Sequence, residues 1–315
     1  MWLNGTSELI QTLKTRGAQK VALQFPEGLK RQVAEYAVRL KEAGFEVIIC
    51  GDPCYGACDL ALETLEFADV LVHFGHAPVD SRKNVIFEPY PVDFDVAVIK
   101  NALPLLKGKS VCLVTTVQHV HLIPQMETFL LSLGIDVRVA GGSARTPFRG
   151  QVLGCSFAAA KGTGADEVLF VGTGLFHATG IAIATRARVI ALDPLAGTAQ
   201  EVNGDTLLRR RFAMMEKAKA ARHIGIIVST KSGQQRMALA QYLLSLAPHA
   251  TIVTMQEVSP DELLNLGFAC YVNTACPRLA YDDQVRFPVP VLSPQEFEII
   301  CGVRTWDDYA IDEIP

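Results

Sequence analysis

The stretch GDPCYGACDLALETLEFADVLVHFG, residues 51–75, has a second copy in the chain, GCSFAAAKGTGADEVLFVG, at residues 154–172. Each copy contains a cysteine, Cys58 or Cys155. In both copies the aspartate of an Ala-Asp pair lies 11 residues after this cysteine, and a glycine lies 17 residues after it. Self-similarity at a fixed spacing is typical of duplicated structural units. Each copy predicts a Gly-bounded loop, a cysteine at the mouth of a short helix, and a buried strand. The two cysteines are therefore expected at equivalent places in two related domains.

Apolar runs of strand length alternate with helical patterns along the whole chain, for example KVALQF at residues 20–25 and HIGIIVST at residues 223–230. This alternation predicts α/β architecture with parallel sheets and right-handed crossovers. The pattern restarts near residues 105 and 223, and the third copy carries its loop cysteine, Cys276, after its third strand. We therefore expect three related Rossmann-like domains, each a small parallel sheet flanked by helices: residues 1–104, 105–208 and 209–315.

The amino-acid composition restricts the class of protein to which the chain can belong. The chain has 315 residues, of which half are hydrophobic, and a net charge of −4, as expected for an ordinary globular protein of two or three domains. Without a polybasic tail or a net basic balance, we expect no nucleic-acid partner. The first residues lack the pattern of a signal peptide, and no apolar run reaches the length of a membrane span. We therefore expect a cytoplasmic protein with no membrane partner.

The eight cysteines are expected to be reduced or metal-bound, because a chain without a secretion signal rarely builds a disulfide framework. Four of them lie within apolar runs, where a free cysteine packs as a small hydrophobe: Cys50, Cys112, Cys270 and Cys301. Three others, Cys58, Cys155 and Cys276, lie in loops at the predicted carboxyl edges of the sheets, where α/β proteins bind ligands. No role can be assigned to Cys54.

Three thiolates, one from each domain, suit a metal centre if the three sheet edges face a common point. Zinc sites favour cysteines paired as C-x2-C, and the sequence contains no such pair. A 4Fe-4S cluster normally binds four cysteines, so three would leave one iron open to a substrate. Reduced thiols without a metal are the alternative, and the spacing alone does not choose between the two.

Two turns are candidates for holding other parts of a ligand. The turn that follows the first strand of the third domain offers backbone N–H groups and a lysine, which suit a carboxylate or a phosphate. A Gly-Thr-Gly turn in the second domain would let a ligand approach the backbone. The residues concerned are Thr230, Lys231, Gly233 and Gln234 in the first turn, and Gly172 and Gly174 in the second. Ordinary polar turns are the alternative interpretation of both.

Two further groups of polar residues carry expectations. The run from Arg209 to Arg222, which includes Arg211, predicts a solvated linker helix, with a docking face for an acidic partner as the alternative. Four histidines are expected at strand ends. Each taken alone is more often a hydrogen-bonded polar residue than a ligand, but their clustering at one edge favours contact of some of them with a substrate. These histidines are His73, His76, His119 and His177.

Five short motifs together resemble one known family. They are PEGL at residues 26–29, YGACD at 55–59, GQVLGCS at 150–156, STKSGQ at 229–234 and NTACPR at 273–278. In combination they resemble the archaeal diphthamide synthases, the radical 2-(3-amino-3-carboxypropyl)histidine synthase family. The resemblance extends over nearly the whole chain.

The resemblance implies three α/β domains in a pseudo-threefold arrangement around a 4Fe-4S cluster that is bound by Cys58, Cys155 and Cys276. It implies that the reduced cluster cleaves S-adenosylmethionine to methylthioadenosine and a 3-amino-3-carboxypropyl radical, which is added to a histidine of translation elongation factor 2. It also implies a homodimer and an electron donor. The two turns would then bind S-adenosylmethionine, with residues 230–234 at its carboxylate and Gly172 and Gly174 at its adenosine or methionine atoms.

Two other interpretations remain open. Quinolinate synthase has a similar plan, with one cluster cysteine from each of three domains, and is a 4Fe-4S hydro-lyase that acts on small molecules. The second is a non-catalytic partner subunit, with or without a cluster, that only binds the elongation factor.

Overall fold

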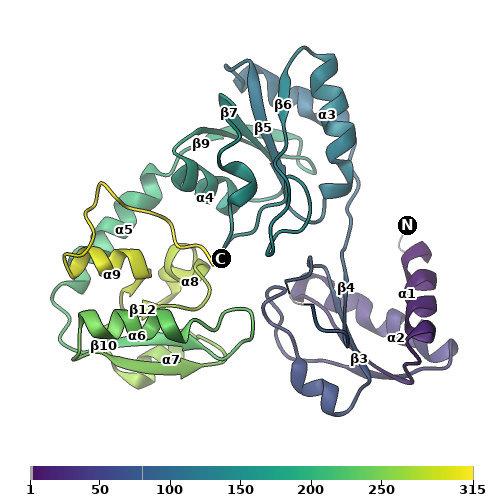
Figure 1. The fold of residues 1–315 in the computed structure, drawn as a ribbon, viewed down its shortest axis with the longest axis horizontal. Helices are drawn as coiled ribbons and strands as arrows, with labels where there is room; N and C mark the ends of the chain where they lie inside the picture. Colours follow the sequence, from purple (N-terminus) through teal and green to yellow (C-terminus); the bar gives the residue numbers. More distant parts are fainter. Residues whose placement is uncertain (1–2, 80, 315) are drawn as a thin grey trace. The chain divides into compact units, whose positions relative to one another are not determined.

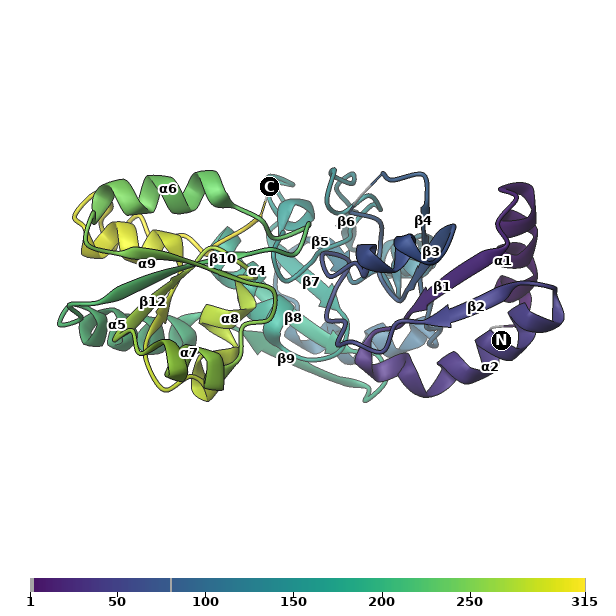
Figure 2. The ribbon, with the colours of Figure 1, turned by 90° about the horizontal axis from the view of Figure 1, so that it is seen from below.

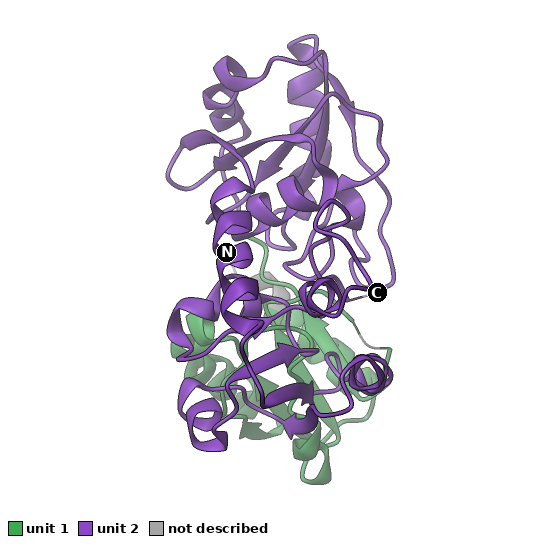
Figure 3. Cartoon of the chain, turned by 90° about the vertical axis from the view of Figure 1, so that its left-hand side faces the viewer, with its two compact units in different colours: residues 1–92 green, residues 93–315 purple. Residues whose placement is uncertain are grey.

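The computed structural model describes residues 3–79 and 81–314, and the chain forms two compact units, Met1–Val92 and Asp93–Pro315 (Figure 3). The first unit contains one sheet and the second contains two (Figure 1). None of the helices in the described part of the chain is long and apolar enough to cross a membrane. The domain boundaries expected at residues 104 and 208 stay predictions.

The first unit is built on a four-stranded parallel sheet in the order β2-β1-β3-β4. Its elements are α1 (Leu3–Thr15), β1 (Lys20–Gln24), α2 (Val33–Glu42), β2 (Glu46–Ile49), β3 (Val70–Phe74) and β4 (Val85–Glu88). The central strands β1 and β3 are almost completely buried, which explains why both are mostly apolar. The helix expected after Cys58 is only a short 3-10 helix, Leu62–Glu66, because the chain must return to β3 within a few residues.

The first sheet of the second unit has the order β6-β5-β7-β8-β9. Its elements are β5 (Ser110–Thr115), α3 (Ile123–Ser132), β6 (Asp136–Arg138), β7 (Glu167–Val171), α4 (Phe176–Thr185), β8 (Arg188–Asp193) and β9 (Thr198–Val202). The last strand runs antiparallel to β8, so the expectation of a purely parallel sheet is wrong at this edge. A tight turn that contains Gly197, at φ 67°, joins the two strands, and such short connections produce antiparallel pairs.

The second sheet of this unit has the order β11-β10-β12-β13 and is parallel throughout. Its elements are α5 (Asp205–Ala218), β10 (Ile224–Ser229), α6 (Met237–Leu246), β11 (Thr251–Met255), α7 (Pro260–Leu266), β12 (Cys270–Asn273), α8 (Arg278–Tyr281), β13 (Val291–Leu292) and α9 (Pro294–Ile300). In all three sheets the first four strands follow one order: second, first, third, fourth. This shared order confirms that the chain contains three related α/β sheets.

The repeated Ala-Asp pair has a structural role at the start of each third strand. The carboxylate of Asp69 accepts hydrogen bonds of 2.8 Å from the backbone amides of Gln19 and Lys20, where β1 begins. Asp166 accepts the equivalent bonds from the amides of Lys109 (2.8 Å), just before β5, and Ser110 (2.9 Å), its first residue. Each aspartate therefore fixes the start of its strand beside the start of the central strand. This function explains the constant spacing in the two copies.

Replacing Asp166 by asparagine should reduce stability at neutral pH but much less in acid. Hydrogen bonds from the amide and hydroxyl of Ser110 and from the amide of Lys109 hold the pKa of Asp166 below its usual value near 3.8. A carboxylate whose pKa is lowered by folding contributes stability above its unfolded pKa, and this contribution is lost as the pH falls through the folded pKa. The difference in thermal midpoint between wild type and Asp166→Asn should therefore shrink between pH 6 and pH 3.

The control for this prediction is Asp136→Asn, because the side chain of Asp136 is 58 % exposed. A difference between wild type and Asp166→Asn that stays constant over this pH range would contradict the proposed contribution of the ionised carboxylate.

Candidate functional site

In the first unit, the PEGL motif and the lysine that follows it hold the loop that precedes Cys58. The ammonium of Lys30 donates hydrogen bonds to the backbone carbonyls of Gly51 (3.0 Å) and Asp52 (2.9 Å). The carboxylate of Glu27 accepts a bond of 3.4 Å from the amide of Cys54. The sequence of this turn is therefore explained by its contacts with the cysteine-containing loop.

His73, near the end of β3, and His76, just after it, lie at the same edge of this sheet. Gln24 and His73 are paired across β1 and β3, and the Nδ1 atom of His73 lies 2.8 Å from the Oε1 atom of Gln24. The other end of the Gln24 amide donates a bond of 2.6 Å to the carbonyl of Asp59, the residue after Cys58. Burial lowers the pKa of His73 to about 3 and that of His76 to about 4. The two histidines, Gln24 and the segment after Cys58 therefore lie together at the carboxyl edge of the first sheet.

In the second unit, Arg145 connects Cys155 to the turn of residues 230–234. Its Nε atom donates a hydrogen bond of 3.3 Å to the Sγ atom of Cys155, and its Nη2 atom donates one of 2.7 Å to the carbonyl of Gly233. A guanidinium has donors only, so the sulfur is the acceptor. The structure thereby brings a predicted cluster cysteine next to a turn that was predicted to bind a carboxylate.

The turn of residues 230–234 follows β10 directly and is partly exposed. Three backbone amides of the turn already donate hydrogen bonds within the protein. The amide of Thr230 donates to a carbonyl of β11, the amide of Lys231 donates to a serine hydroxyl, and the amide of Gln234 donates to a carbonyl within the turn. The ammonium of Lys231 lies 2.9 Å from the carboxylate of Glu257. A bound carboxylate would therefore meet the two central amides of the turn and compete with Glu257 for the lysine.

Cys276 lies between β12 and α8, in a loop that is held at several points. The side chain of Asn273 donates to the carbonyl of Cys276 (2.8 Å) and accepts from the amide of Ala275 (2.9 Å). The guanidinium of Arg236 donates to the carbonyls of Thr274 (2.6 Å) and Ala275 (3.0 Å). The thiol is therefore partly exposed on a loop whose backbone is fixed.

The C-terminal segment joins the loops of Cys155 and Cys276. Asp312 is 1 % exposed and forms a two-pronged ion pair with Arg236, with distances of 2.9 and 2.6 Å. The amide of Ile314 donates a bond of 2.8 Å to the carbonyl of Cys155. In Figures 1 and 2 this segment runs from α9 toward the sheet that contains β5 and β7. Within the second unit the structure therefore connects both predicted cluster loops and the predicted carboxylate turn.

The two glycines predicted to face a ligand also have structural reasons to be glycine. Gly174 has a φ of 72°, in the left-handed region that favours glycine. A Cβ atom on Gly172 would lie 2.7 Å from the ring of Phe170. A ligand contact at these positions stays a prediction. His177 lies on α4 rather than at a strand end, and burial, with the nearby charge of Arg278, lowers its pKa to about 4.

Three of the four cysteines expected in the core are buried, namely Cys50, Cys112 and Cys270. Burial raises the pKa of Cys270 to about 12, so this thiol stays protonated and is a poor metal ligand. The expectation of burial is wrong for Cys301, which is only partly buried because it ends α9 at the surface. The three predicted cluster cysteines are all partly exposed.

Close packing fixes the segment that follows Cys155. The ring of Phe157 is completely buried, and a Cβ atom on Gly180 of α4 would lie 2.2 Å from it. Alanine in a helix interior normally gains about 0.5–1 kcal/mol over glycine, whereas overpacking a core costs about 1–3 kcal/mol. Gly180→Ala should therefore give a net destabilisation of about 1–2 kcal/mol, measured by denaturant unfolding.

Gly141→Ala is the matched control in the same unit, because an added Cβ atom at this exposed glycine meets nothing within 4 Å. Equal stabilities of the Gly180→Ala and Gly141→Ala variants would show that the ring of Phe157 can shift away from the added methyl group without loss of folding free energy.

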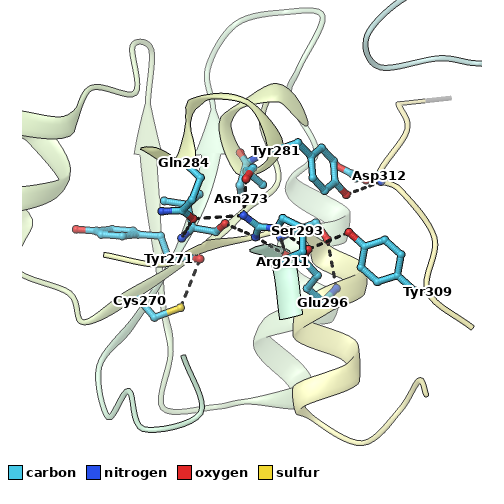
Figure 4. A network of polar contacts seen from close by, with 12 residues as sticks. Arg211, Cys270, Tyr271, Asn273, Tyr281, Gln284, Ser293, Glu296, Tyr309 and Asp312 are labelled. Atoms are coloured by element: carbon cyan, nitrogen blue, oxygen red, sulfur yellow. Dashed lines mark hydrogen bonds and ion pairs between the residues drawn. The ribbon is translucent and has the colours of Figure 1, made fainter. Parts of the chain in front are cut away.

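Arg211 lies on α5 and is 1 % exposed, so the expectation of a fully solvated basic helix is wrong at this position (Figure 4). Its guanidinium forms a two-pronged ion pair with Glu296 of α9, with distances of 2.7 and 2.6 Å. Its remaining N–H groups donate to the carbonyls of Ala280 and Val291 and to the side chain of Gln284. All five donors are thus used, which is what makes a buried arginine tolerable.

Comparisons with known proteins decide the family. Residues 25–311 match the family model described as "Putative diphthamide synthesis protein". The chain belongs to the diphthamide synthesis family. A 2-(3-amino-3-carboxypropyl)histidine synthase of Pyrococcus horikoshii is 37 % identical over 98 % of this chain and 92 % of that protein. One of Methanocaldococcus jannaschii is 26 % identical over 94 % of this chain and 87 % of its own length.

A solved structure of a diphthamide family member has the same fold. It is described as Dph2 from Pyrococcus horikoshii with a 4Fe-4S cluster and is 36 % identical, with a TM-score of 0.93 over 98 % of this chain and 93 % of that chain. The family and the α/β fold expected from the sequence motifs are therefore confirmed.

Two arginines of this chain that no sequence motif revealed, Arg145 and Arg236, support the candidate site. Both lie in loops of the second unit, and each bonds to a segment far away in the sequence: Arg145 to Gly233, and Arg236 to Asp312. A positive charge in a glycine-rich loop directly before GQVLGCS was the available signal for Arg145.

Proposed function

We propose that this chain is a 2-(3-amino-3-carboxypropyl)histidine synthase, which transfers the 3-amino-3-carboxypropyl group of S-adenosylmethionine to a histidine of translation elongation factor 2. The observation that carries the proposal is the pair of hydrogen bonds from Arg145 to the sulfur of Cys155 and to the carbonyl of Gly233. They put a candidate cluster ligand beside a turn that suits the amino-acid end of S-adenosylmethionine. Membership of the diphthamide synthesis family supports the same reaction.

The donor set of this chain fits a 4Fe-4S cluster. Cys58, Cys155 and Cys276 are partly exposed and lie in loops that follow strands, whereas the raised pKa of buried Cys270 makes that thiol unsuitable as a ligand. The three loop cysteines would hold the cluster, as the repeat and the family membership indicate. When bound and reduced, the cluster supplies the electron that cleaves the bond between the sulfonium and the methionine γ-carbon.

The residues of the second unit would orient the reactants. Arg145 fixes the Cys155 sulfur by a hydrogen bond, and hydrogen bonds to cysteine sulfurs are one means by which proteins tune such clusters. Arg236 and Asp312 hold the backbone that carries Cys276. Lys231 would bind the carboxylate of S-adenosylmethionine, while Gly172 and Gly174 leave room for its other atoms.

Three partners belong to the proposal. They are elongation factor 2 as the protein substrate, an electron donor that reduces the cluster, and a second copy of the chain in a homodimer. Because the protein substrate works in translation, the proposed place of action is the cytoplasm.

The test is made without oxygen. The purified protein is reduced with dithionite and incubated with S-adenosylmethionine, and the nucleoside product is identified by chromatography. Methylthioadenosine that disappears in Cys58→Ala, Cys155→Ala and Cys276→Ala, but not in Cys301→Ser, is the expected result. A chain that holds iron and forms no nucleoside would favour the hydro-lyase or the non-catalytic subunit instead.

Lys231→Met should weaken the binding of S-adenosylmethionine and leave iron in place. A charged hydrogen bond contributes about 1.5–3 kcal/mol, so the dissociation constant should rise about 10- to 100-fold. Isothermal titration with S-adenosylmethionine measures the constant, and Lys219→Met, which removes an exposed lysine paired with Glu216, is the control. Loss of iron in Lys231→Met would count against a role for this lysine in cofactor binding alone.

A further inference from the structure

Cys54, His73 and His76 form a compact group of potential metal ligands in the first unit. One ligand atom from each of the three residues lies within 4.8 Å of the other two. Cys54 and His73 are buried, at 1 % and 0 % exposure, while His76 is partly exposed and connects the group to the surface. None of the three is a candidate ligand of the cluster proposed above.

The tautomer of His73 follows from its surroundings. The Oε1 atom of Gln24 accepts a bond of 3.2 Å from the amide of Ala61, and its Nε2 atom donates to the carbonyl of Asp59, so the orientation of this amide is fixed. The Nδ1 atom of His73, 2.8 Å from Oε1, must therefore carry the proton. The Nε2 atom of His73 then presents its lone pair to His76 and to the space between the two rings.

This arrangement is the one that proteins use to orient a metal-binding histidine. Such a histidine donates its second ring N–H to a carboxylate or carbonyl oxygen, which fixes the ring and its tautomer. The Nε2 atom of His73 lies 2.9 Å from the Nδ1 atom of His76. Two nitrogens bound to tetrahedral zinc at about 2.0–2.1 Å are about 3.3 Å apart, so the rings need to separate by only a few tenths of an ångström.

The charges and the donor types indicate which ion would fit. One thiolate and two neutral imidazoles suit zinc, which takes nitrogen and sulfur ligands in tetrahedral sites. The carboxylate of Asp59 is 9 % exposed and lies close enough to act electrostatically on His76. A thiolate and this carboxylate together would balance a divalent ion in a buried place, where an uncompensated charge is costly.

We propose that Cys54, His73 and His76 bind a zinc ion, separate from the cluster, with a fourth position open to water. The site joins the loop of Cys54 to the end of β3. Because Cys58 lies four residues further along the same loop, zinc would fix the backbone from which this cysteine projects.

The test uses the full chain with Cys58, Cys155 and Cys276 all replaced by alanine, so that the thiols of the proposed cluster bind no metal. Co²⁺ is the probe, since a tetrahedral cobalt–thiolate site gives visible d–d bands and a sulfur-to-cobalt charge-transfer band in the near ultraviolet. The expected result is saturation at one Co²⁺ per chain and displacement of the cobalt by Zn²⁺. Circular dichroism confirms that the variant is folded.

Two further substitutions in that background identify the ligands. Cys54→Ser should abolish the charge-transfer band, and His76→Asn, at a partly exposed position, should weaken cobalt binding; Cys301→Ser should change neither. Failure to bind Co²⁺, or a spectrum that Cys54→Ser leaves unchanged, would overturn the proposal and show that the two histidines are only hydrogen-bonded to each other. The result is independent of methylthioadenosine formation, so it is distinguishable from a failure of the proposed function.

Discussion

Replacing Arg211 by methionine should destabilise the second unit by about 3–5 kcal/mol, because a buried carboxylate would lose its only ion-pair partner among the described residues. Glu296 is 0 % exposed and, within residues 3–79 and 81–314, would keep as hydrogen-bond donors the amide of Ser293 and the hydroxyl of Tyr309. Two backbone carbonyls, those of Ala280 and Val291, would also lose a donor. Each loss of this kind costs more than the bond itself contributes, because no water replaces the donor.

Denaturant unfolding measures this effect, and Arg210→Met is the matched control, because Arg210 is an exposed arginine one residue earlier on the same helix. The double variant Arg211→Met/Glu296→Met should recover part of the loss, since it removes the unpaired carboxylate. An Arg211→Met chain as stable as the Arg210→Met chain would show that the network tolerates the buried charge.

Replacing Arg145 by leucine should lower iron retention and methylthioadenosine formation by about 10- to 100-fold, which is the usual cost of losing a residue that supports a metal ligand. The substitution removes both the donor to the Cys155 sulfur and the link to the carbonyl of Gly233. Arg145→Lys should restore part of the iron but less of the activity, because an ammonium cannot reproduce the two directions of the guanidinium.

Iron content, reduction potential of the cluster and product formation are measured together, so that a loss of fold is recognised. Arg149→Leu is the control, because this arginine lies in the same loop but is 56 % exposed and pairs with Glu127. If Arg145→Leu and Arg149→Leu behave alike, Arg145 has no part in positioning Cys155.

The repeats of the fold were predictable because each copy needs the same kinds of residue at equivalent positions. Asp69 and Asp166 occupy equivalent positions since each fixes the start of a central strand, and buried parallel strands require continuous apolar runs. The antiparallel strand β9 was not predictable in this way, because its sequence, TAQEV, is polar and is placed by its turn.

The candidate site was predictable only where its residues lie in recognisable motifs. The three loop cysteines and the turn of residues 230–234 are candidates because of the motifs around them, and their roles stay predictions. Arg145, Arg236 and Arg211 were not identified, because their partners lie 88, 76 and 85 residues away in the sequence. The sequence alone does not distinguish an exposed arginine from a buried one, because the acceptors of a buried arginine are brought near it only by the fold.

The bond between Ile314 and Cys155 has a consequence for biosynthesis. Chains begin to fold while they are being translated, and segments made early can become compact before the later ones exist. The sheet from β5 to β9 is complete by residue 202, yet the Cys155 segment lacks this partner until more than a hundred further residues have been translated. On a ribosome that has not reached residue 314, the carbonyl of Cys155 therefore lacks this hydrogen-bond donor. For the cluster ligand proposed at Cys155, we therefore expect insertion after synthesis of the second unit rather than during it.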